Sequence, residues 1–365
     1  MRIAFDVSPL SAPQSGVATY TRNLAHHLSS RQHDQLLPMT HATLATRGAR
    51  RSLPVNKTLW MQVLLPLQLS RVGADVCHFT NSVASWWTPC PSVVTIHDTT
   101  LWMFPRYHPR RRLLAMRPFI PRGAQRARAI IAVSAATKRD VVRTFKVPES
   151  KVHVIYEAAA PHFRPLAREA ALDAVRDKYG LPKSFILYVG TIEPRKNLVR
   201  LFEAFDLVRR QGCQSSGLAL VGHRGWDDDA ILASLERLGL NGAVRVLGPV
   251  PTEEVVALYN LADVVAFPSL YEGFGLPVIE AMACGTPVVT SPNGSLAEIA
   301  GGAAELVDPT RVDSIAAGLR AVLSDRDRWT ALHRAGLERA AQFSWEAAAA
   351  QTRQVYEAVS KAPFA

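Results

Sequence analysis

The sequence predicts an α/β protein built from two doubly wound domains. Its 365 residues exceed what one hydrophobic core usually spans. Short apolar, β-branched runs alternate with amphipathic stretches along the whole chain, and a polar stretch rich in proline and glycine interrupts this alternation near the middle. Because such alternation is typical of βα units, we expect a mostly parallel sheet in each half of the chain.

Eleven apolar runs predict the strands. Five lie in the first half of the chain, at Ile3–Val7, Val76–Phe79, Val93–Ile96, Ile130–Val133 and Val152–Ile155. Six lie in the second half, at Phe185–Val189, Leu218–Val221, Val244–Leu247, Val264–Phe267, Val288–Thr290 and Glu305–Val307. The stretches between them have helical periodicity, as in Leu198–Val208, where apolar side chains share one face.

The polar stretch 157–182, with its prolines and glycine, predicts the domain boundary. We expect a first domain over residues 1–165 and a second over residues 166–344. A final helix, Trp345–Lys361, follows the second domain, and we expect the segment 345–365 to pack back on the first.

The composition excludes several classes of protein. The four cysteines, at positions 77, 90, 213 and 284, form no Cys-x-x-Cys pair, so neither a zinc site nor a disulfide framework is predicted. Residues Met1–Asp6 begin a strand rather than a signal peptide, and no segment reaches the ~20 apolar residues of a membrane span. We therefore expect a cytoplasmic protein.

Positive charge is concentrated in the first half of the chain. Residues 1–165 contain 22 Lys and Arg against 7 Asp and Glu, a net charge of +15, whereas residues 166–365 contain 20 against 24, a net charge of −4. The densest group, with Trp102, Phe104 and Tyr107 nearby, is Arg106, Arg110, Arg111, Arg112, Arg117 and Arg122. These arginines could face the anionic inner surface of the cell membrane, a phosphorylated acceptor or nucleic acid, or could simply be solvated.

Two further features have a structural and a functional interpretation. The pair Trp86-Trp87 could form an acceptor platform, a membrane-facing patch or ordinary packing. The run Asp227-Asp228-Asp229 resembles a set of metal ligands, but it precedes a predicted helix, where acidic side chains complement the helix dipole. For this acidic run we predict the helix-dipole role and no metal site.

Ligands of open parallel sheets bind beyond the carboxyl ends of the strands. The predicted strands place there the residues Gly16, His97, Asp98, Ser134, Gly190, Arg195, Lys196, Gly222 and Glu272. This set combines glycines, cations, a histidine and carboxylates, which are the groups that a sugar diphosphate requires.

The stretch Pro268–Pro287 is the most informative part of the chain. A strand ends, a glycine-rich turn follows, and Pro277 suits the first turn of a helix. The free N–H groups of Phe274, Gly275 and Leu276 would then lie at a helix N-terminus, which attracts anions.

With these motifs the chain resembles the retaining glycosyltransferases of family 4, which have the GT-B fold of two Rossmann-like domains that face each other across a cleft. The resemblance covers nearly the whole chain and is most specific between Gly248 and Pro309. It is supported by the segments 188–197 and 133–140. Within the family, Ile96-His97-Asp98 and the segment 295–301 are most similar to bacterial mannosyltransferases that extend O-antigen-like polysaccharides.

The resemblance implies a role for each matching residue. Glu272 would bind hydroxyls of the donor sugar, Glu280 those of the ribose, and His97 would orient or polarise the sugar near its reacting face. Arg195 and Lys196 would neutralise the departing diphosphate in place of a metal ion. The remaining contacts to the donor nucleotide would come from Gly16, Gly190, Gly222, Val250, Phe274, Gly275 and Leu276.

The resemblance also implies the reaction and its partners. We expect no cofactor, GDP-mannose as donor, and a saccharide or lipid-linked acceptor, with the anomeric configuration retained by front-face attack. A UDP-sugar donor, or a sugar epimerase or phosphorylase of the same fold, remains an alternative.

The chain departs from the family pattern at two places. Ser15-Gly16-Val17 has one glycine where many relatives have two, and Glu157-Ala158 stands where many have Asn-Gly.

Two alternatives come from other classes. An NAD-dependent oxidoreductase would need Gly-x-Gly-x-x-Gly after the first strand, and residues 7–21 lack this motif. A nucleic-acid-binding protein would explain the basic half, but the sequence contains no known module that reads bases, so we predict no nucleic-acid partner.

Overall fold

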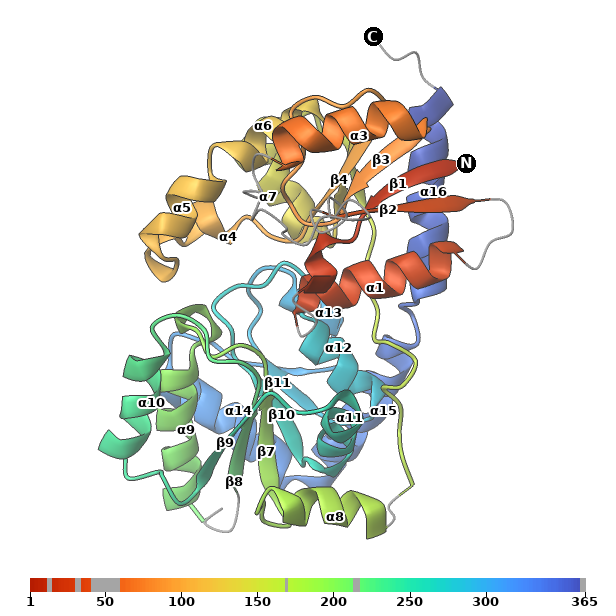
Figure 1. The fold of residues 1–365 in the computed structure, drawn as a ribbon. Helices are drawn as coiled ribbons and strands as arrows, with labels where there is room; N and C mark the ends of the chain where they lie inside the picture. Colours follow the sequence, from red (N-terminus) through yellow and green to blue (C-terminus); the bar gives the residue numbers. More distant parts are fainter. Residues whose placement is uncertain (12–14, 30–33, 41–59, 168–169, 213–216, 362–365) are drawn as a thin grey trace, which may run out of the picture. The chain divides into compact units, whose positions relative to one another are not determined.

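Two six-stranded sheets, in which every strand pair is parallel, form the framework of the chain in the computed structural model (Figure 1). The structure describes residues 1–11, 15–29, 34–40, 60–167, 170–212 and 217–361. Contacts divide the chain into unit 1, Met1–Glu157 with Trp345–Ala365, and unit 2, Ala158–Ser344. The predicted α/β class with two doubly wound sheets is confirmed.

The division after Glu157 precedes the expected boundary at residue 165. The reason is that the connecting segment packs on helix α11 (Thr252–Leu261) of unit 2. Asn260 of this helix donates a hydrogen bond to the Arg164 carbonyl and accepts one from the Leu166 N–H. The ring of Phe163 packs edge-on against Tyr259 of the same helix. The prolines at 161 and 165 therefore lie inside unit 2 rather than before it.

Sheet A of unit 1 has the strand order β2-β1-β3-β4-β5-β6. The strands are β1 (Arg2–Asp6), β2 (Gln35–Met39), β3 (Val76–Phe79), β4 (Ser92–Ile96), β5 (Ala129–Ala132) and β6 (Val152–Val154). The helices are η1 (Ser8–Ser11), α1 (Gly16–Ser29), the π-helix η3 (Trp60–Leu64), α3 (Leu65–Val72), α4 (Thr100–Met103), η4 (Pro105–Tyr107), α5 (Arg110–Met116), α6 (Phe119–Arg126), α7 (Ala135–Phe145), η5 (Glu149–Lys151) and α16 (Trp345–Lys361).

The strand β2 is the one strand of sheet A that the sequence analysis missed. Pro38 has no backbone N–H and Gln35 is polar, so the segment lacks the pattern of a buried strand. Its position at the edge of the sheet, paired with β1 alone, makes a proline tolerable there.

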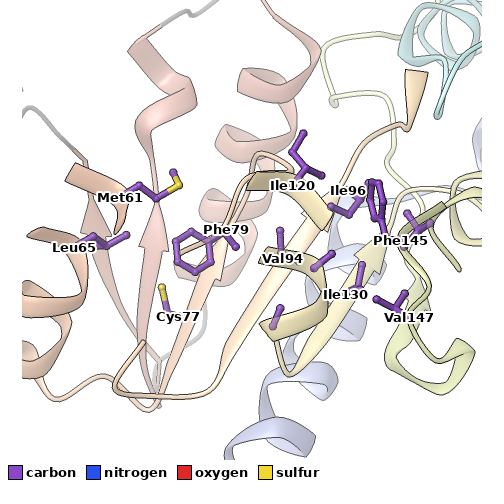
Figure 2. Close-up of a cluster of buried hydrophobic side chains, with 14 of the residues drawn as sticks. Met61, Leu65, Cys77, Phe79, Val94, Ile96, Ile120, Ile130, Phe145 and Val147 are labelled. Atoms are coloured by element: carbon purple, nitrogen blue, oxygen red, sulfur yellow. The ribbon is translucent and has the colours of Figure 1, made fainter. Parts of the chain in front are cut away.

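The two faces of sheet A bury different sets of side chains because successive residues of a strand point to opposite faces. On one face, Cys77, Phe79, Val94 and Ile130 join a core with side chains from α3, α6 and α7 (Figure 2). The other face is covered by α1 and α16, which pack against each other, and α16 also contacts β3 and β5 (Figure 1). The C-terminal helix is thus part of unit 1.

Hydrogen bonds also hold α16 to the sheet. His78 of β3 is fully buried, with Nδ1 2.5 Å from the Tyr356 hydroxyl of α16 and Nε2 2.8 Å from the Thr95 hydroxyl of β4. The Tyr20 hydroxyl of α1 lies 2.8 Å from the same threonine oxygen. Burial lowers the pKa of His78 to about 3, so this imidazole is neutral.

Sheet B of unit 2 has the strand order β12-β11-β10-β7-β8-β9. The strands are β7 (Phe185–Val189), β8 (Gly217–Val221), β9 (Val244–Gly248), β10 (Val264–Phe267), β11 (Val288–Thr290) and β12 (Glu305–Leu306). Besides α11, the helices are α8 (Ala170–Lys178), η6 (Pro194–Lys196), α9 (Leu198–Arg210), α10 (Asp228–Arg237), α12 (Leu276–Ala283), α13 (Leu296–Ala300), α14 (Val312–Ser324) and α15 (Arg326–Ala340). Helices lie on both faces of the sheet, with α9 and α14 on one and α11, α12 and α15 on the other (Figure 1).

Among the described residues, no helix combines the length and the apolar character that a membrane span requires.

Candidate active site

The strand order of sheet B marks where a ligand should bind. The chain runs outward through β7, β8 and β9 and then returns, so that β10 pairs with the other side of β7. In doubly wound sheets, the crevice outside the carboxyl ends of the strands at such a reversal is the usual ligand site. The two loops at this place are residues 190–197, after β7, and residues 268–275, after β10.

A cluster of four buried charged side chains joins these two loops. Arg195 NH2 lies 2.6 Å from Glu193 Oε1, and Arg195 NH1 lies 2.9 Å from Glu272 Oε2. Lys196 Nζ donates to Glu272 Oε1 at 2.7 Å and lies 4.8 Å from the centre of the Phe267 ring. We call these residues, Glu193, Arg195, Lys196 and Glu272, the ion cluster.

The charges of the ion cluster stabilise one another. Burial alone would raise the pKa of Glu272, but the charges of Arg195 and Lys196 and their hydrogen bonds outweigh burial and lower it to about 2. The carboxylate is therefore ionised at neutral pH. Such a group is stable in a protein interior only while its partners remain in place.

The two cations of the cluster differ in how far the protein already engages them. The Arg195 guanidinium donates to the Tyr271 carbonyl at 2.5 Å in addition to its two carboxylate partners, so it ties the β10 loop to the β7 loop. The Lys196 ammonium has three N–H donors, and among the described residues its hydrogen-bond acceptor is Glu272. Lys196 is thus better placed than Arg195 to bind an added anion.

The helix α12 begins at the same edge of the sheet. Gly275 takes the N-cap position with φ +105°, and a Cβ there would lie 2.7 Å from Leu296 Cδ2, so the turn requires glycine. In the described structure, no side chain caps this helix and no acidic residue lies in its first turn. The predicted N–H groups of Phe274, Gly275 and Leu276 therefore lie at a helix start that can accept an anion.

A second loop, residues 291–295, supports this turn, and the sequence analysis cited only its last residue, as the start of the segment 295–301. Asn293 donates to the Leu270 carbonyl at 3.0 Å, and the Ser295 hydroxyl donates to the Phe274 carbonyl at 2.6 Å. At Gly294, a Cβ would clash with the backbone oxygen of Glu272. The run Pro-Asn-Gly-Ser at 292–295 was a turn signal that could have identified this loop.

Glu280 lies on α12, one helical turn and more beyond the N-cap. The hydroxyl of Tyr259 donates to Glu280 Oε2 at 3.1 Å. Because Tyr259 is fully buried in α11, it fixes the direction of this half-buried carboxylate. No pattern in the sequence singled out Tyr259, since its contact to Glu280 arises from the packing of α11 on α12.

Gly190 and Gly222 have a structural reason to be glycine. They follow β7 and β8, both with positive φ, and a Cβ on Gly222 would clash with the Gly190 carbonyl. The Gly222 N–H donates to the Gly248 carbonyl at 2.9 Å. Val250, two residues further on, is buried. The three predicted nucleotide contacts therefore share the carboxyl edge of sheet B, and the close approach of backbones explains both glycines without a ligand.

In unit 1, the predicted residues lie at the carboxyl edge of sheet A. Gly16 opens α1, where the Ser15 hydroxyl accepts a hydrogen bond from the Ala18 N–H at 3.2 Å. His97 directly follows β4, and its side chain is 14% exposed. Its Nδ1 lies 3.2 Å from Glu157 Oε1 and its Nε2 lies 2.9 Å from the Thr80 carbonyl oxygen.

The acidic run 227–229 starts a helix, as predicted. Asp227 takes the N-cap position of α10, Asp228 and Asp229 lie in its first turn, and Arg224 forms ion pairs with both. In the part of the chain that the structure describes, no group of three or more His, Cys, Asp or Glu side chains is arranged to hold a metal ion.

The low pKa of Glu272 predicts how the stability of unit 2 depends on pH. Since the pKa falls from 4.5 in the unfolded chain to about 2 in the folded one, the ionised group stabilises the fold above pH 4.5, and this contribution, about 3 kcal/mol, is lost as the pH falls toward 2. In urea unfolding, the free energy of unfolding of the wild type should exceed that of Glu272→Gln at pH 6, and the difference should shrink between pH 4.5 and 2.

The matched control is Glu236→Gln, which changes an exposed carboxylate on α10. Its difference from the wild type should stay within about 0.5 kcal/mol throughout. A pH-independent difference for Glu272→Gln would contradict the ion cluster as described.

Comparison with known proteins agrees with this geometry. The model of the family "Glycosyltransferase Family 4" matches residues 14–161, and that of "Glycosyl transferases group 1" matches residues 173–340. The O-antigen chain mannosyltransferase B of Escherichia coli is 37% identical to this chain over 98% of its length and 100% of the length of that protein.

Two solved structures share the fold. Sucrose-phosphate synthase from Thermosynechococcus elongatus has a TM-score of 0.76 at 22% identity, covering 98% of both chains. The Anabaena protein Alr3699/HepE in complex with UDP-glucose has a TM-score of 0.76 at 19% identity, covering 98% of this chain and 100% of that one. Together with a relative that matches along its entire length, these findings show that the chain belongs to the family 4 glycosyltransferases and is a glycosyltransferase with the GT-B fold.

Proposed function

We propose that this glycosyltransferase moves mannose from GDP-mannose to a saccharide or lipid-linked acceptor, with retention of configuration and without a metal ion. The observation that carries the proposal is the buried ion cluster at the strand-order reversal of sheet B, next to the start of α12. The cations and the helix start can bind the anionic diphosphate of a nucleotide sugar, and the carboxylate can bind the hydroxyl groups of its sugar.

The diphosphate would be held by the N-terminus of α12 and by Lys196. Glu193 and Glu272 already balance the two cations within the ion cluster, so a bound anion needs further positive potential. The N–H groups at the start of α12 supply it, and Lys196 adds the N–H donors that Glu272 does not use. Together they stabilise the negative charge that grows on the leaving diphosphate.

The two glutamates would bind hydroxyl groups of the donor. An ionised carboxylate only accepts hydrogen bonds, and sugar hydroxyls donate them. Glu272 would accept from the hexose, since it adjoins the cations that hold the diphosphate. Glu280, held in place by Tyr259, would accept from the ribose.

At the anomeric carbon, the reaction forms one bond and breaks one. The acceptor hydroxyl oxygen bonds to the anomeric carbon from the face that the diphosphate leaves, while the bond from that carbon to the diphosphate oxygen breaks. The proton of the acceptor passes to the leaving diphosphate. The protein provides charge and position in this scheme, and no side chain forms a covalent intermediate.

The choice of mannose follows from the full-length relative, whose name gives mannose as the transferred sugar. A UDP-sugar is the alternative donor, since the similar Anabaena structure contains UDP-glucose. An epimerase of the same fold would rearrange the sugar without a saccharide acceptor, and a phosphorylase would transfer the sugar to or from inorganic phosphate.

We also propose that unit 1 contacts an anionic membrane from the cytoplasmic side. The predicted arginines at 106, 110, 111, 112 and 122 are exposed, whereas Arg117 donates to the Leu101 carbonyl at 2.7 Å. On α5, Leu114 is 78% exposed and shares a face with Arg110 and Arg111, at helical spacings of four and three residues. An apolar side chain among arginines suits the boundary between acyl chains and anionic headgroups.

Of the pair Trp86-Trp87, the first packs against the protein and the second is exposed. Trp86 stacks on Phe119 of α6, with the ring centres 5.1 Å apart, and Arg122 lies over its ring. Trp87 is 58% exposed and could enter the same membrane boundary.

A donor assay tests the transferase proposal. The release of nucleoside diphosphate should be fastest with GDP-mannose in a panel of nucleotide sugars and should depend on a mannose-terminated acceptor. Lys196→Gln should lower kcat by roughly 100-fold or more, because it removes a charge-assisted donor to the leaving group. Lys183→Gln, an exposed lysine before the amino end of β7, is the control. Activity of Lys196→Gln near that of the control would refute the site, and acceptor-independent turnover would refute transfer.

Metal independence has its own test. After EDTA treatment and removal of the chelator, kcat with GDP-mannose should stay within about twofold of the untreated value, since protein cations and N–H groups neutralise the diphosphate. A loss that added Mg²⁺ or Mn²⁺ reverses would contradict this part of the proposal.

Vesicle sedimentation tests the membrane contact. The protein should sediment with vesicles of phosphatidylglycerol and phosphatidylcholine at low salt, and less so as salt rises. Arg110→Glu/Arg111→Glu should weaken this binding at least about tenfold, since each basic residue contributes about 1 kcal/mol. Arg245→Glu/Arg334→Glu, which changes exposed arginines of unit 2 by the same total charge, should not. Equal loss in both variants would show that net charge alone attracts the vesicles.

A further inference from the structure

His97 and Glu157 form a buried pair, and the partners of the two ring nitrogens determine whether the imidazole carries one proton or two. One ring nitrogen faces a carboxylate oxygen of Glu157, at 3.2 Å, and the other faces the carbonyl oxygen of Thr80, at 2.9 Å. A carbonyl oxygen accepts hydrogen bonds only, and so does an ionised carboxylate. Both side chains are mostly enclosed by the protein, with 14% of the His97 and 4% of the Glu157 side chain exposed, so these protein oxygens are the main partners of the two ring nitrogens.

A neutral imidazole carries one N–H and therefore cannot donate to both oxygens. With Glu157 ionised, a neutral His97 would place one nitrogen lone pair against an oxygen lone pair. The imidazolium, which carries two N–H groups, satisfies both contacts. The pKa agrees in direction, because burial would lower the pKa of His97 but the hydrogen bond and charge of Glu157, with the Thr80 carbonyl, raise it above its usual value.

The other groups around His97 do not replace the Glu157 carboxylate as the partner that favours the imidazolium. Tyr20 of α1 places its ring edge-on at 4.9 Å, and the Ser82 hydroxyl accepts from the backbone N–H of His97. Asp98, next in sequence, adds a weaker favourable charge, and His78 is neutral. Asp98 is itself bonded to the backbone N–H and hydroxyl of Thr100.

The nearby His78 shows what the same fold does to a histidine without a carboxylate. It too is buried and bonded at both nitrogens, but its partners are the hydroxyls of Tyr356 and Thr95. A hydroxyl can donate as well as accept, so a neutral ring satisfies both contacts. The partner's chemistry, rather than burial, thus distinguishes the two histidines.

We propose that Glu157 is a positioning residue that holds His97 as a fixed imidazolium at the carboxyl edge of sheet A, and that sugar transfer requires this charge. The charge of His97 does not depend on the proposed function. Only the claim that sugar transfer requires this charge rests on it. Since both N–H groups of the imidazolium are used within unit 1, His97 carries its charge without giving or taking a proton. An Asn-Gly pair, which the family resemblance leads one to expect at 157–158, carries no charge and could not do this.

The charge is measured by NMR of the full chain with ¹⁵N-labelled histidine. In the wild type at neutral pH, both ring nitrogens of His97 should have the shifts of protonated nitrogens, while His78 should show a neutral ring. In Glu157→Gln, the amide can donate to one nitrogen, and His97 should titrate about one pH unit or more lower. A neutral His97 in the wild type, or an unchanged titration in Glu157→Gln, would overturn the assignment.

The requirement for the charge is measured by the pH dependence of kcat with GDP-mannose. Wild-type activity should fall as the pH rises through the pKa of His97 measured by NMR. Glu157→Gln should move this alkaline midpoint down by the same interval. Glu149→Gln, which changes an exposed carboxylate of η5 that pairs with Lys138, should leave it unchanged. A midpoint that does not follow the His97 titration would refute the role in transfer but not the charge, whereas a wild type without transferase activity would refute the proposed function instead.

Discussion

Glu272 and the two cations beside it determine the geometry of the loops at the carboxyl edge of sheet B. A buried carboxylate is costly unless charged or hydrogen-bonded partners compensate the loss of water, and Arg195 and Lys196 do so from a different loop. The contact therefore fixes the distance between the loops after β7 and β10. This contact also positions its neighbours, which are the turn at Gly275, the start of α12 and the supporting loop at 291–295.

In both units, hydrogen-bonded partners set the charge of a buried side chain, but the partners differ between the units. In unit 2, two carboxylates and two cations balance each other, so that an added anion must be held by helix N–H groups and by the unused donors of Lys196. In unit 1, one carboxylate faces one imidazole, whose second nitrogen faces a carbonyl. The charge of His97 is thus set by its partners, as that of Glu272 is. Both sites lie at the carboxyl ends of parallel strands, where loop backbone and side chains are not committed to a sheet.

The two units of the chain differ in net charge and in the side chains that they expose. The predicted sugar, phosphate and ribose contacts of unit 2 lie on a framework of buried strands and helices, and its net charge is low. Unit 1 carries the excess of arginine, and its short helices α5 and α6 expose arginines together with Leu114. Under the proposed function, this basic, partly apolar surface would suit a lipid-linked acceptor, since its arginines would attract the headgroup and its apolar side chain the acyl chain.

The sequence by itself determined the α/β class, eleven of the twelve strands that the structure describes, and the helix start at Gly275, because periodicity, glycine turns and charged residues after strands are local signals. It could not determine the edge strand with Pro38, which looks like a loop until it pairs with β1. Nor could it distinguish Arg195, engaged by Glu193 and Tyr271, from Lys196, or identify Tyr259 and Glu157 as partners of Glu280 and His97. These contacts join residues that are distant in sequence, so only the packing of strands and helices brings them within hydrogen-bonding distance.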